Sequence, residues 1–469
     1  MRADAPEANA QRPNRVHEEA QAEAGLSDEW RRALAWIERE LDGKAVRFER
    51  QPRWRPAAFL DLERDGQSIP LYFRGDRGAS DHGVYPLEHE MRVLQVLEAH
   101  GIPVPHIYGF CPDPRGIVMA RAPGRPVAQL VSEEAGTRQA VFDDYIDILA
   151  RMHRIDPAAL EAIGLSRPRQ AQELALVDFD AWERVYRGKK RRPEPLIEFV
   201  IRWVRGNIPQ GRNRVSLLTG DCGQFLYRND RVTVLHDLEL ACLGDPAADL
   251  AGLRCRDTSE PLGDLARAIR RYGEIVGEEV DLEAVDFHTV RLGICTPMSV
   301  QAVVADPPPG TNLVQYLAWY LVYARLPLEV LAWRLGVELT PIDMPEERQT
   351  RHSPGYRALV SLLDDDPRST VSDRYRIDAA GRIAEYIRRA DLLGPAFEEQ
   401  DLDEMGVILG RRPANWIDGD AALEALVLTA APERSAEFVR YFHRRMLRQE
   451  ALLKPVMREL EHANFQRIR

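Results

Sequence analysis

Five of the six carboxylates in one short segment of this chain stand among apolar residues. The residues from Leu217 to Ala251 read LLTGDCGQFLYRNDRVTVLHDLELACLGDPAADLA. The acidic side chains of interest all stand beside residues expected to be buried: Asp221, Asp237, Glu239, Asp245 and Asp249. A buried carboxylate is costly unless it is paired, hydrogen-bonded or bound to a metal. This segment is therefore the first candidate for a functional site.

Turn signals inside the segment bring its polar residues together. The apolar runs QFLY and VTVL flank Asn229 and Asp230, a pair typical of a hairpin tip. The hairpin would bring Asp221 and Gln224, which precede it, close to Asp237, which follows it. One aspartate could accept a proton from a substrate hydroxyl, while the other and an amide oxygen hold Mg²⁺. Kinases divide phosphoryl transfer in this way.

The elements before this segment predict a small α+β lobe. An amphipathic helix is expected over SDEWRRALAWIERELDG, with Ser27 as its cap and Trp30, Leu34, Ile37 and Leu41 as its apolar face. Strand-like runs follow, with a hairpin signal at Asp65-Gly66. A second helix is expected over LEHEMRVLQVLEAHG, and two strands come after it. This order favours an antiparallel sheet.

Beyond Gly124 the pattern becomes helical. Segments such as AVFDDYIDILARMHRID and LVQYLAWYLVYARLPLEVLAWRLG carry apolar residues at helical spacing. A polar, proline-bearing stretch from about Thr340 to Ser353 predicts a linker to further helices. The predicted divisions are a mobile N-terminal tail (1–26), an N-lobe (27–120), a helical C-lobe with the carboxylate segment (121–339), the linker (340–353) and a C-terminal helical domain (354–469).

Bulk composition excludes several classes of protein. The chain has 469 residues, of which 45% are hydrophobic and 29% charged, with no apolar run long enough to span a bilayer. Its first residues lack the apolar core of a secretory signal, so we expect no membrane role and a cytoplasmic location. The five scattered cysteines fit reduced thiols better than disulfides or a zinc site. The net charge of -11 disfavours nucleic acid as a partner.

One basic run stands out against this acidic balance. The sequence RGKKRRP occupies residues 187–193. It is interpreted either as a solvated loop between helices or as a binding site for an anionic substrate group.

The carboxylate segment resembles the core of the aminoglycoside phosphotransferase superfamily, the kinase-like enzymes that phosphorylate hydroxyls of small molecules. Their pattern runs HGDxxxxN, a hairpin, then IDWExAxxGDPxxDLA. Here TGDCGQFL, LHDLELACLGDP and AADLA follow in the same order and at nearly the same spacing. The resemblance implies a protein-kinase-like bilobal fold, with an antiparallel-sheet N-lobe and a mainly helical C-lobe. It also implies ATP and Mg²⁺ as cofactors and a small-molecule hydroxyl as substrate.

Residue roles carried over by position follow from that resemblance. Asp221 would be the catalytic base, and Asp237 the principal metal ligand. Glu239 would be a neighbour of a second metal, while Asp245 and Asp249 would support the fold.

The resemblance extends backwards into the predicted N-lobe. Arg74, in LYFRG, falls where the family places the basic residue that holds the ATP phosphates. The family pairs that residue with a helix glutamate, here Glu90 of EMRVL. Glu88 points to a different helix face and is the alternative partner.

The likeness continues through the junction between the two lobes. IVMARAPG, from Ile117 to Gly124, resembles the hinge along which the adenine lies, which implies nucleotide contacts for Met119 and Arg121. LARMHRID resembles the helix after the hinge. The resemblance covers about Val46 to Gly336, and not the N-terminal tail or the last hundred-odd residues.

Three departures from the family pattern concern the site itself. The histidine before Gly-Asp is replaced by Thr219. The position of the metal-binding asparagine, five beyond Asp221, holds Leu226, whereas a loop two residues shorter would place the amide of Gln224 there. The first hairpin, RQPRWRPAAF, has no glycine, so Arg53 or Arg55 could meet the phosphates with charge instead of backbone.

These departures keep two functions open. The first is an active kinase, whose substrate should lie against the region from Arg256 to about Gly336. That region carries many arginines: Arg254, Arg256, Arg267, Arg270, Arg271 and Arg291. They favour a neutral or anionic metabolite, such as a hydroxyacyl thioester, over a polycationic aminoglycoside. The alternative is a catalytically impaired pseudokinase that serves as a nucleotide-binding or scaffold protein.

The last helix of the chain leaves its own question open. It carries a run of apolar side chains: Phe438, Tyr441, Phe442, Met446 and Leu453. They could pack within their own domain or join the subunits of a homo-oligomer.

Overall fold

The computed structural model describes residues 26–51, 55–77, 85–350, 352–364 and 371–469. The chain divides into two compact units, the first ending at Pro123 and the second beginning at Gly124. None of the helices in the described ranges is both long and apolar enough to cross a membrane.

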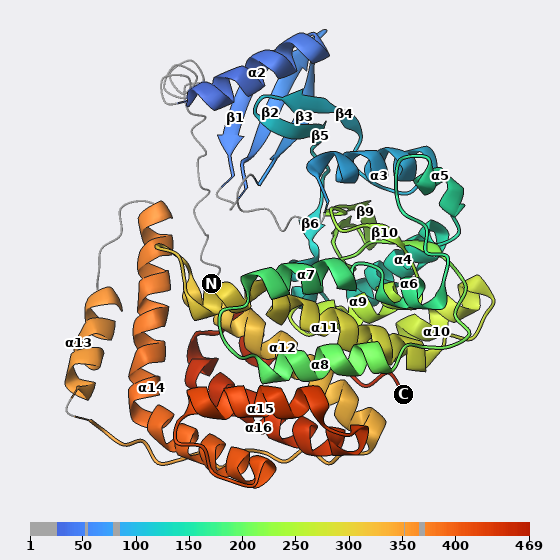
Figure 1. Cartoon of the computed structure of the whole chain (residues 1–469). Coiled ribbons are helices and arrows are strands. Elements are labelled where there is room, and N and C mark those ends of the chain that lie inside the picture. Colours follow the sequence, from blue (N-terminus) through green and yellow to red (C-terminus); the bar gives the residue numbers. More distant parts are fainter. Residues whose placement is uncertain (1–25, 52–54, 78–84, 351, 365–370) are drawn as a thin grey trace, which may run out of the picture. The chain divides into compact units, whose positions relative to one another are not determined.

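The first unit is a five-stranded antiparallel sheet with two helices beside it (Figure 1). Its strands lie in the spatial order β1-β2-β3-β5-β4. The elements are α2 (Asp28–Leu41), β1 (Lys44–Arg50), β2 (Ala57–Arg64), β3 (Gln67–Gly75), α3 (Leu87–Ala99), β4 (Ile107–Pro112) and β5 (Arg115–Ala120). Asp65 and Gly66 take φ angles of 52° and 73°, as the tight β2–β3 hairpin requires. The predicted antiparallel α+β lobe is confirmed.

Helix α2 covers the sheet with a stripe that differs in one place from the prediction. Trp30, Ile37 and Leu41 are buried as expected, but Ala33 is buried where Leu34 was predicted, and Leu34 is only half-buried. At that turn the buried face of α2 is therefore shifted by one residue toward the N-terminus relative to the prediction. The rings of Trp30 and Phe73 meet edge-on with centroids 5.3 Å apart, which fixes the helix on β3.

The second unit is mainly helical and contains two small sheets. In one sheet β7 (Ser216–Leu218) pairs with β10 (Cys242–Gly244), and in the other β8 (Phe225–Arg228) lies between β6 (Arg125–Pro126) and β9 (Arg231–Leu235). The α-helices are α4 (Ala135–Met152), α5 (Pro157–Glu161), α6 (Ala171–Leu176), α7 (Phe179–Lys189), α8 (Pro195–Gly206), α9 (Ala247–Asp257), α10 (Leu265–Val276), α11 (Leu282–Ala305), α12 (Leu313–Leu335), α13 (Ser353–Asp364), α14 (Val371–Leu409), α15 (Trp416–Thr429) and α16 (Ser435–Leu453). The 3₁₀ helices are η2 (Val127–Ser132), η3 (Pro432–Arg434), η4 (Lys454–Val456) and η5 (Arg458–His462).

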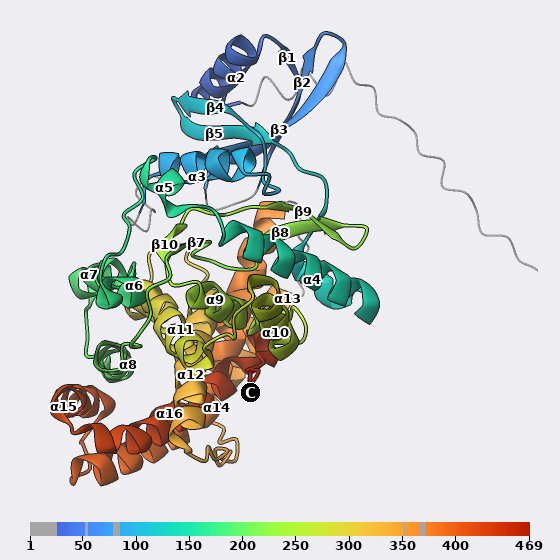
Figure 2. The same ribbon diagram turned by 90° about the vertical axis from the view of Figure 1, so that its right-hand side faces the viewer.

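Helices α14, α15 and α16 share one hydrophobic core with α8, α11 and α12. Residues 337–350 form no helix or strand, yet the chain beyond them returns to this core (Figures 1 and 2). Phe199 of α8 contacts two rings of α16, with centroids 5.6 Å away at Phe438 and 5.9 Å away at Phe442. The apolar residues singled out on the last helix are all buried: Phe438, Tyr441, Phe442, Met446 and Leu453. These side chains therefore pack within the chain.

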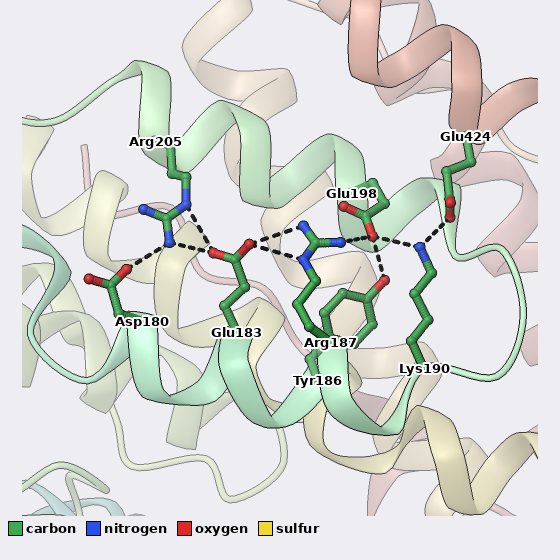
Figure 3. Close-up of polar contacts among 8 residues, drawn as sticks. All are labelled: Asp180, Glu183, Tyr186, Arg187, Lys190, Glu198, Arg205 and Glu424. Atoms are coloured by element: carbon green, nitrogen blue, oxygen red, sulfur yellow. Dashed lines mark hydrogen bonds and ion pairs between the residues drawn. The ribbon is translucent and has the colours of Figure 1, made fainter.

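A network of charged side chains joins α7 to α8 and α15 (Figure 3). The Nζ atom of Lys190 lies 2.7 Å from a carboxylate oxygen of both Glu198 and Glu424. Glu198 also accepts hydrogen bonds from Arg187 and from the Tyr186 hydroxyl. Two cations of the run RGKKRRP are thus neutralised by carboxylates, which favours a role in packing over a site for an anionic substrate.

Candidate active site

Asp221 stands on a tight turn between β7 and β8 that two glycines make possible. Gly220 and Gly223 take φ angles of 78° and 88°, a conformation that glycine adopts without strain. A Cβ on Gly220 would lie 2.1 Å from the carbonyl oxygen of Leu240, so any larger residue would push the turn away from the segment after β9. The turn therefore lies against the segment that carries Asp237 and Glu239.

The structure brings Asp221, Gln224 and Asp237 together. The amide Nε2 of Gln224 donates to Asp221 Oδ2 at 2.8 Å and to Asp237 Oδ2 at 3.4 Å. The β8–β9 hairpin turns at Asn229 and Asp230, with φ angles of 49° and 62°, as its sequence predicts. The predicted meeting of the three side chains across this hairpin is confirmed.

Asp237 has an uncommon backbone conformation. Its φ is 60°, in the left-handed region that residues other than glycine seldom adopt, although aspartate tolerates it better than most. Such local strain is concentrated at functional positions. Two residues later, Glu239 is half-buried in the turn that leads to β10.

The oxygen atoms available here suit Mg²⁺ only if other ligands complete its shell. Nowhere in the described ranges do three or more His, Cys, Asp or Glu side chains converge as a ready-made metal site. Asp237 offers a carboxylate and Gln224 an amide oxygen, both hard ligands. Mg²⁺ commonly takes one or two carboxylates and fills its shell with water and substrate phosphates. The donor set fits an ion held jointly with a nucleotide.

Helix α4 fixes the turn from its buried side. The backbone N–H of Gly223 donates to the Tyr145 hydroxyl at 2.9 Å, and that hydroxyl lies 3.1 Å from Cys222 Sγ. Burial raises the pKa of both the Tyr145 hydroxyl and the Cys222 thiol well above their usual values, so both groups stay neutral. All five cysteines are free thiols, as predicted.

Asp249 holds the strand that leads into the turn. It accepts hydrogen bonds from the backbone N–H of Thr219 at 2.9 Å and from the Thr219 hydroxyl, also at 2.9 Å. It also lies 3.1 Å from Nε2 of His153, whose Nδ1 is 2.7 Å from the Tyr272 hydroxyl. Thr219, which stands where the family has histidine, is therefore part of a satisfied buried network. The structural role predicted for Asp249 is confirmed.

Asp245 supports the end of β10 and the start of α9. Arg212 makes two hydrogen bonds of 2.7 Å to its carboxylate, and the backbone N–H of Ala247 adds a third contact at 3.0 Å. Burial opposes its ionisation, but Arg212 and His288 outweigh burial and hold the pKa of Asp245 well below its usual range. The structural role predicted for Asp245 is likewise confirmed.

The buried ring of His288 predicts a loss of stability in acid. Burial lowers its pKa to about 4, with Asp245 opposing and Arg291 and Arg212 reinforcing the shift. The pKa of a histidine in an unfolded chain is about 6.5. As the pH falls, the unfolded state therefore binds the proton before the native state does. The free energy of unfolding should fall by up to about 3 kcal/mol between roughly pH 6.5 and 4, and this contribution is fully present above that range.

Urea unfolding at several pH values checks this expectation. His288→Gln should flatten the decline in unfolding midpoint between roughly pH 6.5 and 4. His462→Gln, at an exposed histidine, is the control and should leave the decline unchanged. Identical pH profiles for the wild type and His288→Gln would contradict the assignment.

In the first unit, Arg74 is paired with Glu90 as predicted. Arg74 Nε donates to Glu90 Oε2 at 2.7 Å, and the two side chains are only 8% and 2% exposed. Glu88, the alternative partner, instead accepts from Arg115, whose Nη2 lies 2.7 Å from both carboxylate oxygens. The pair joins β3 to α3 and fixes the Arg74 guanidinium.

The two hinge residues occupy different settings at the end of β5. Met119 is buried within the sheet. Arg121 donates to Asp61 Oδ1 at 2.6 Å, and its guanidinium lies 5.5 Å from the centre of the Phe59 ring. Of the two arginines considered for the first hairpin, Arg55 is buried and Arg53 lies outside the described residues.

Arg256 is a residue of the site that sequence reasoning missed. Its Nη2 lies 2.5 Å from Asp221 Oδ1. The sequence placed Arg256 only at the edge of a region rich in arginines. No motif links two residues that are 35 positions apart, so the signal lies in the packing of α9 alone.

The fold is kinase-like, and part of the chain is similar to the phosphotransferases. Specifically, residues 85–288 match the phosphotransferase enzyme family, and this stretch includes Asp221, Gln224 and Asp237. A crystal structure from Ralstonia eutropha, described as an aminoglycoside phosphotransferase, superposes with a TM-score of 0.51 at 20% identity. The superposition covers 65% of this chain and 97% of that one. The predicted kinase-like fold is confirmed.

Two curated relatives are similar over part of their length. Acyl-CoA dehydrogenase family member 10 of Mus musculus is 29% identical over 223 residues, which are 42% of this chain and 20% of the relative. Acyl-CoA dehydrogenase family member 11 of Rattus norvegicus is 24% identical over 212 residues, 40% of this chain and 27% of the relative. The chain therefore spans only a minor part of both relatives.

Proposed function

We propose that the protein transfers the γ-phosphoryl group of ATP to a hydroxyl of a small molecule, with Mg²⁺ as the accompanying ion. The observation that carries the proposal is the meeting of Asp221, Gln224 and Asp237 across one hairpin. It lies inside the stretch that matches the phosphotransferase enzyme family.

Asp221 suits the role of base that orients and deprotonates the acceptor hydroxyl. Its side chain is 45% exposed, so a substrate hydroxyl can approach it. A base must come within hydrogen-bond reach of the proton that it accepts. The oxygen that would receive the proton is Oδ2, which Gln224 contacts through a neutral amide.

Asp237 and Gln224 would hold Mg²⁺, which when bound neutralises charge on the transferring phosphates. The amide group of Gln224 can rotate to present Oε1 in place of Nε2. That rotation would also release Oδ2 of Asp221 for the acceptor. Gln224 thereby supplies the oxygen that asparagine provides in the family pattern.

Arg74 would contact the ATP phosphates while Glu90 keeps its guanidinium in place. A buried, charge-assisted hydrogen bond of 2.7 Å supports this assignment because it leaves the guanidinium few orientations. Met119 and Arg121 would contact the nucleotide base, and Glu239 a second metal ion, by analogy with the family.

The acceptor would be a neutral or anionic metabolite, and a hydroxyacyl thioester suits best. Both curated relatives are named for acyl-CoA chemistry, which supports a thioester-bearing substrate over an aminoglycoside. The arginine-rich stretch from Arg254 to Arg291 adds no support for an anionic acceptor, because three of its arginines are neutralised by aspartates.

A screen for ADP release tests the proposal. The full chain is incubated with Mg-ATP and a panel of hydroxyacyl-CoA thioesters, other hydroxylated metabolites and one aminoglycoside. We expect ADP release above the acceptor-free rate with a hydroxyacyl thioester and none with the aminoglycoside. If Mg-ATP neither shifts the melting temperature nor yields ADP at any magnesium concentration, the phosphotransferase proposal fails.

One observation favours a non-catalytic nucleotide-binding or scaffold protein as a second candidate. Both carboxylate oxygens of Asp221 are engaged, Oδ1 by Arg256 and Oδ2 by Gln224. Such a carboxylate is a poor base unless one contact is released. Stabilisation by Mg-ATP without turnover of any acceptor would establish this second candidate.

A further inference from the structure

Arg256 contacts Asp221, the proposed base, directly. It lies in the last turn of α9, and its side chain is only 13% exposed. Its Nη2 donates to Asp221 Oδ1 at 2.5 Å, while Nε lies 3.4 Å from the carbonyl oxygen of Cys222. A third nitrogen, Nη1, lies 3.4 Å from Oε1 of Glu260. The guanidinium of Arg256 thus contacts the Asp221 side chain, the backbone carbonyl of Cys222 and the carboxylate of Glu260.

The turn that carries Asp221 packs closely against helix α9 and Arg256. A Cβ on Gly223 would lie 3.0 Å from Cγ of Arg256, and a Cβ on Gly252 would lie 2.8 Å from Cβ of Cys222. The two glycines therefore let the turn and α9 approach each other closely. The aliphatic part of the Arg256 side chain packs against the turn. Its guanidinium is therefore held beside Asp221.

We propose that Arg256 is a positioning residue for phosphoryl transfer, which holds Asp221 Oδ1 so that Oδ2 is presented to the acceptor hydroxyl. The inference rests on the proposed function. The two partners of Asp221 differ in charge, because Arg256 donates from a guanidinium and makes an ion pair, whereas Gln224 donates from a neutral amide. The contact to Gln224 is the one to be exchanged during the reaction, and the contact to Arg256 is kept.

Lysine cannot reproduce this arrangement fully. Its ammonium is a single point of charge, whereas the three contacts of Arg256 leave from three nitrogens in one plane. Lysine could still reach one oxygen of Asp221. Arg256→Lys should therefore retain more activity than Arg256→Gln, which keeps polarity but loses the charge.

The test separates positioning from folding. ADP formation by the full chain is measured with Mg-ATP and the best acceptor of the screen, for the wild type, Arg256→Lys and Arg256→Gln. We expect Arg256→Gln to lower kcat by about 10- to 100-fold, since a misplacement of about 1 Å costs on the order of 10²-fold. The KM for ATP should change by less than about twofold, because no phosphate contact is removed, and Arg256→Lys should have an intermediate kcat.

Arg254 provides the matched control. It is a buried arginine on the same helix, and its Nη1 donates to Asp286 at 2.8 Å instead of to Asp221. Arg254→Gln should lower the melting temperature without a selective loss of kcat in the folded protein. If Arg256→Gln does not fold, Arg256→Lys decides the question by the same comparison of kcat with KM.

Each outcome has a distinct meaning. A wild type that forms no ADP with any acceptor removes the proposed function and the role of Arg256 with it. A wild type that turns over while both Arg256 variants keep its kcat overturns the positioning role alone. The role is also overturned if kcat falls no further in the Arg256 variants than in Arg254→Gln.

Discussion

Asp221→Asn is expected to lower kcat for ADP formation by about 10²- to 10⁴-fold, the range that a positioned general base contributes. Asparagine has nearly the same shape and can still contact Arg256 and Gln224, but it cannot accept the proton of the acceptor hydroxyl. Stabilisation by Mg-ATP should persist, because Asp237 and Gln224 are unchanged. Coupled detection of ADP gives kcat, and thermal denaturation gives nucleotide binding on the same preparation.

The hairpin tip offers a matched control for this substitution. Asp230 is exposed, has a φ of 62° and lies on the hairpin that follows Asp221 in the chain. Asparagine accepts this left-handed conformation readily, so Asp230→Asn should preserve both fold and rate. A wild-type kcat in Asp221→Asn would remove the assignment of Asp221 as the base and leave the carboxylate a structural role.

Local sequence signals predicted the parts of the site that depend on neighbours along the chain. Asp65-Gly66 and Asn229-Asp230 each adopt the paired positive φ angles of tight hairpins. Because the second hairpin has a fixed length, it also determined that Gln224 and Asp237 would meet. The Arg74–Glu90 pair followed from the family pattern, and the structure distinguishes it from the alternative with Glu88.

Contacts that depend on tertiary packing were not predictable from the sequence. Arg256 approaches Asp221 because Gly223 and Gly252 permit close packing of the turn on α9, and no periodic pattern encodes that approach. The C-terminal helices carry an apolar face that the sequence shows clearly. A face of this kind does not specify its partner, and here it packs on α8 and α12 in one core.

Tertiary packing also keeps the turn intact although Thr219 replaces the family histidine. Thr219 gives both its backbone N–H and its hydroxyl to Asp249, which His153 contacts from the other side. The buried carboxylate is thus satisfied by a set of donors from separate parts of the chain. A departure at one motif position therefore does not by itself indicate loss of function, because the network can be completed by residues that the motif does not contain.

Asp237→Asn is expected to remove the magnesium-dependent part of ATP binding, and phosphoryl transfer with it. With a neutral amide in place of the Asp237 carboxylate, Gln224 remains as a weak ligand. The described residues contain no group of three His, Cys, Asp or Glu side chains that could bind the ion instead. Wild-type protein with Mg-ATP at about 100 times its Kd should gain about 2.7 kcal/mol of stability. The variant should lose most of this gain, and adding magnesium should not restore it.

A titration of magnesium at fixed ATP, followed by thermal denaturation, measures the loss directly. Asp264→Asn is the matched control, because Asp264 caps α10 through the backbone N–H of Arg267 and asparagine caps a helix equally well. The control should respond to magnesium like the wild type. If Asp237→Asn keeps the full magnesium-dependent shift, the ion is held elsewhere, and the left-handed backbone of Asp237 must be explained by the turn into β10 alone.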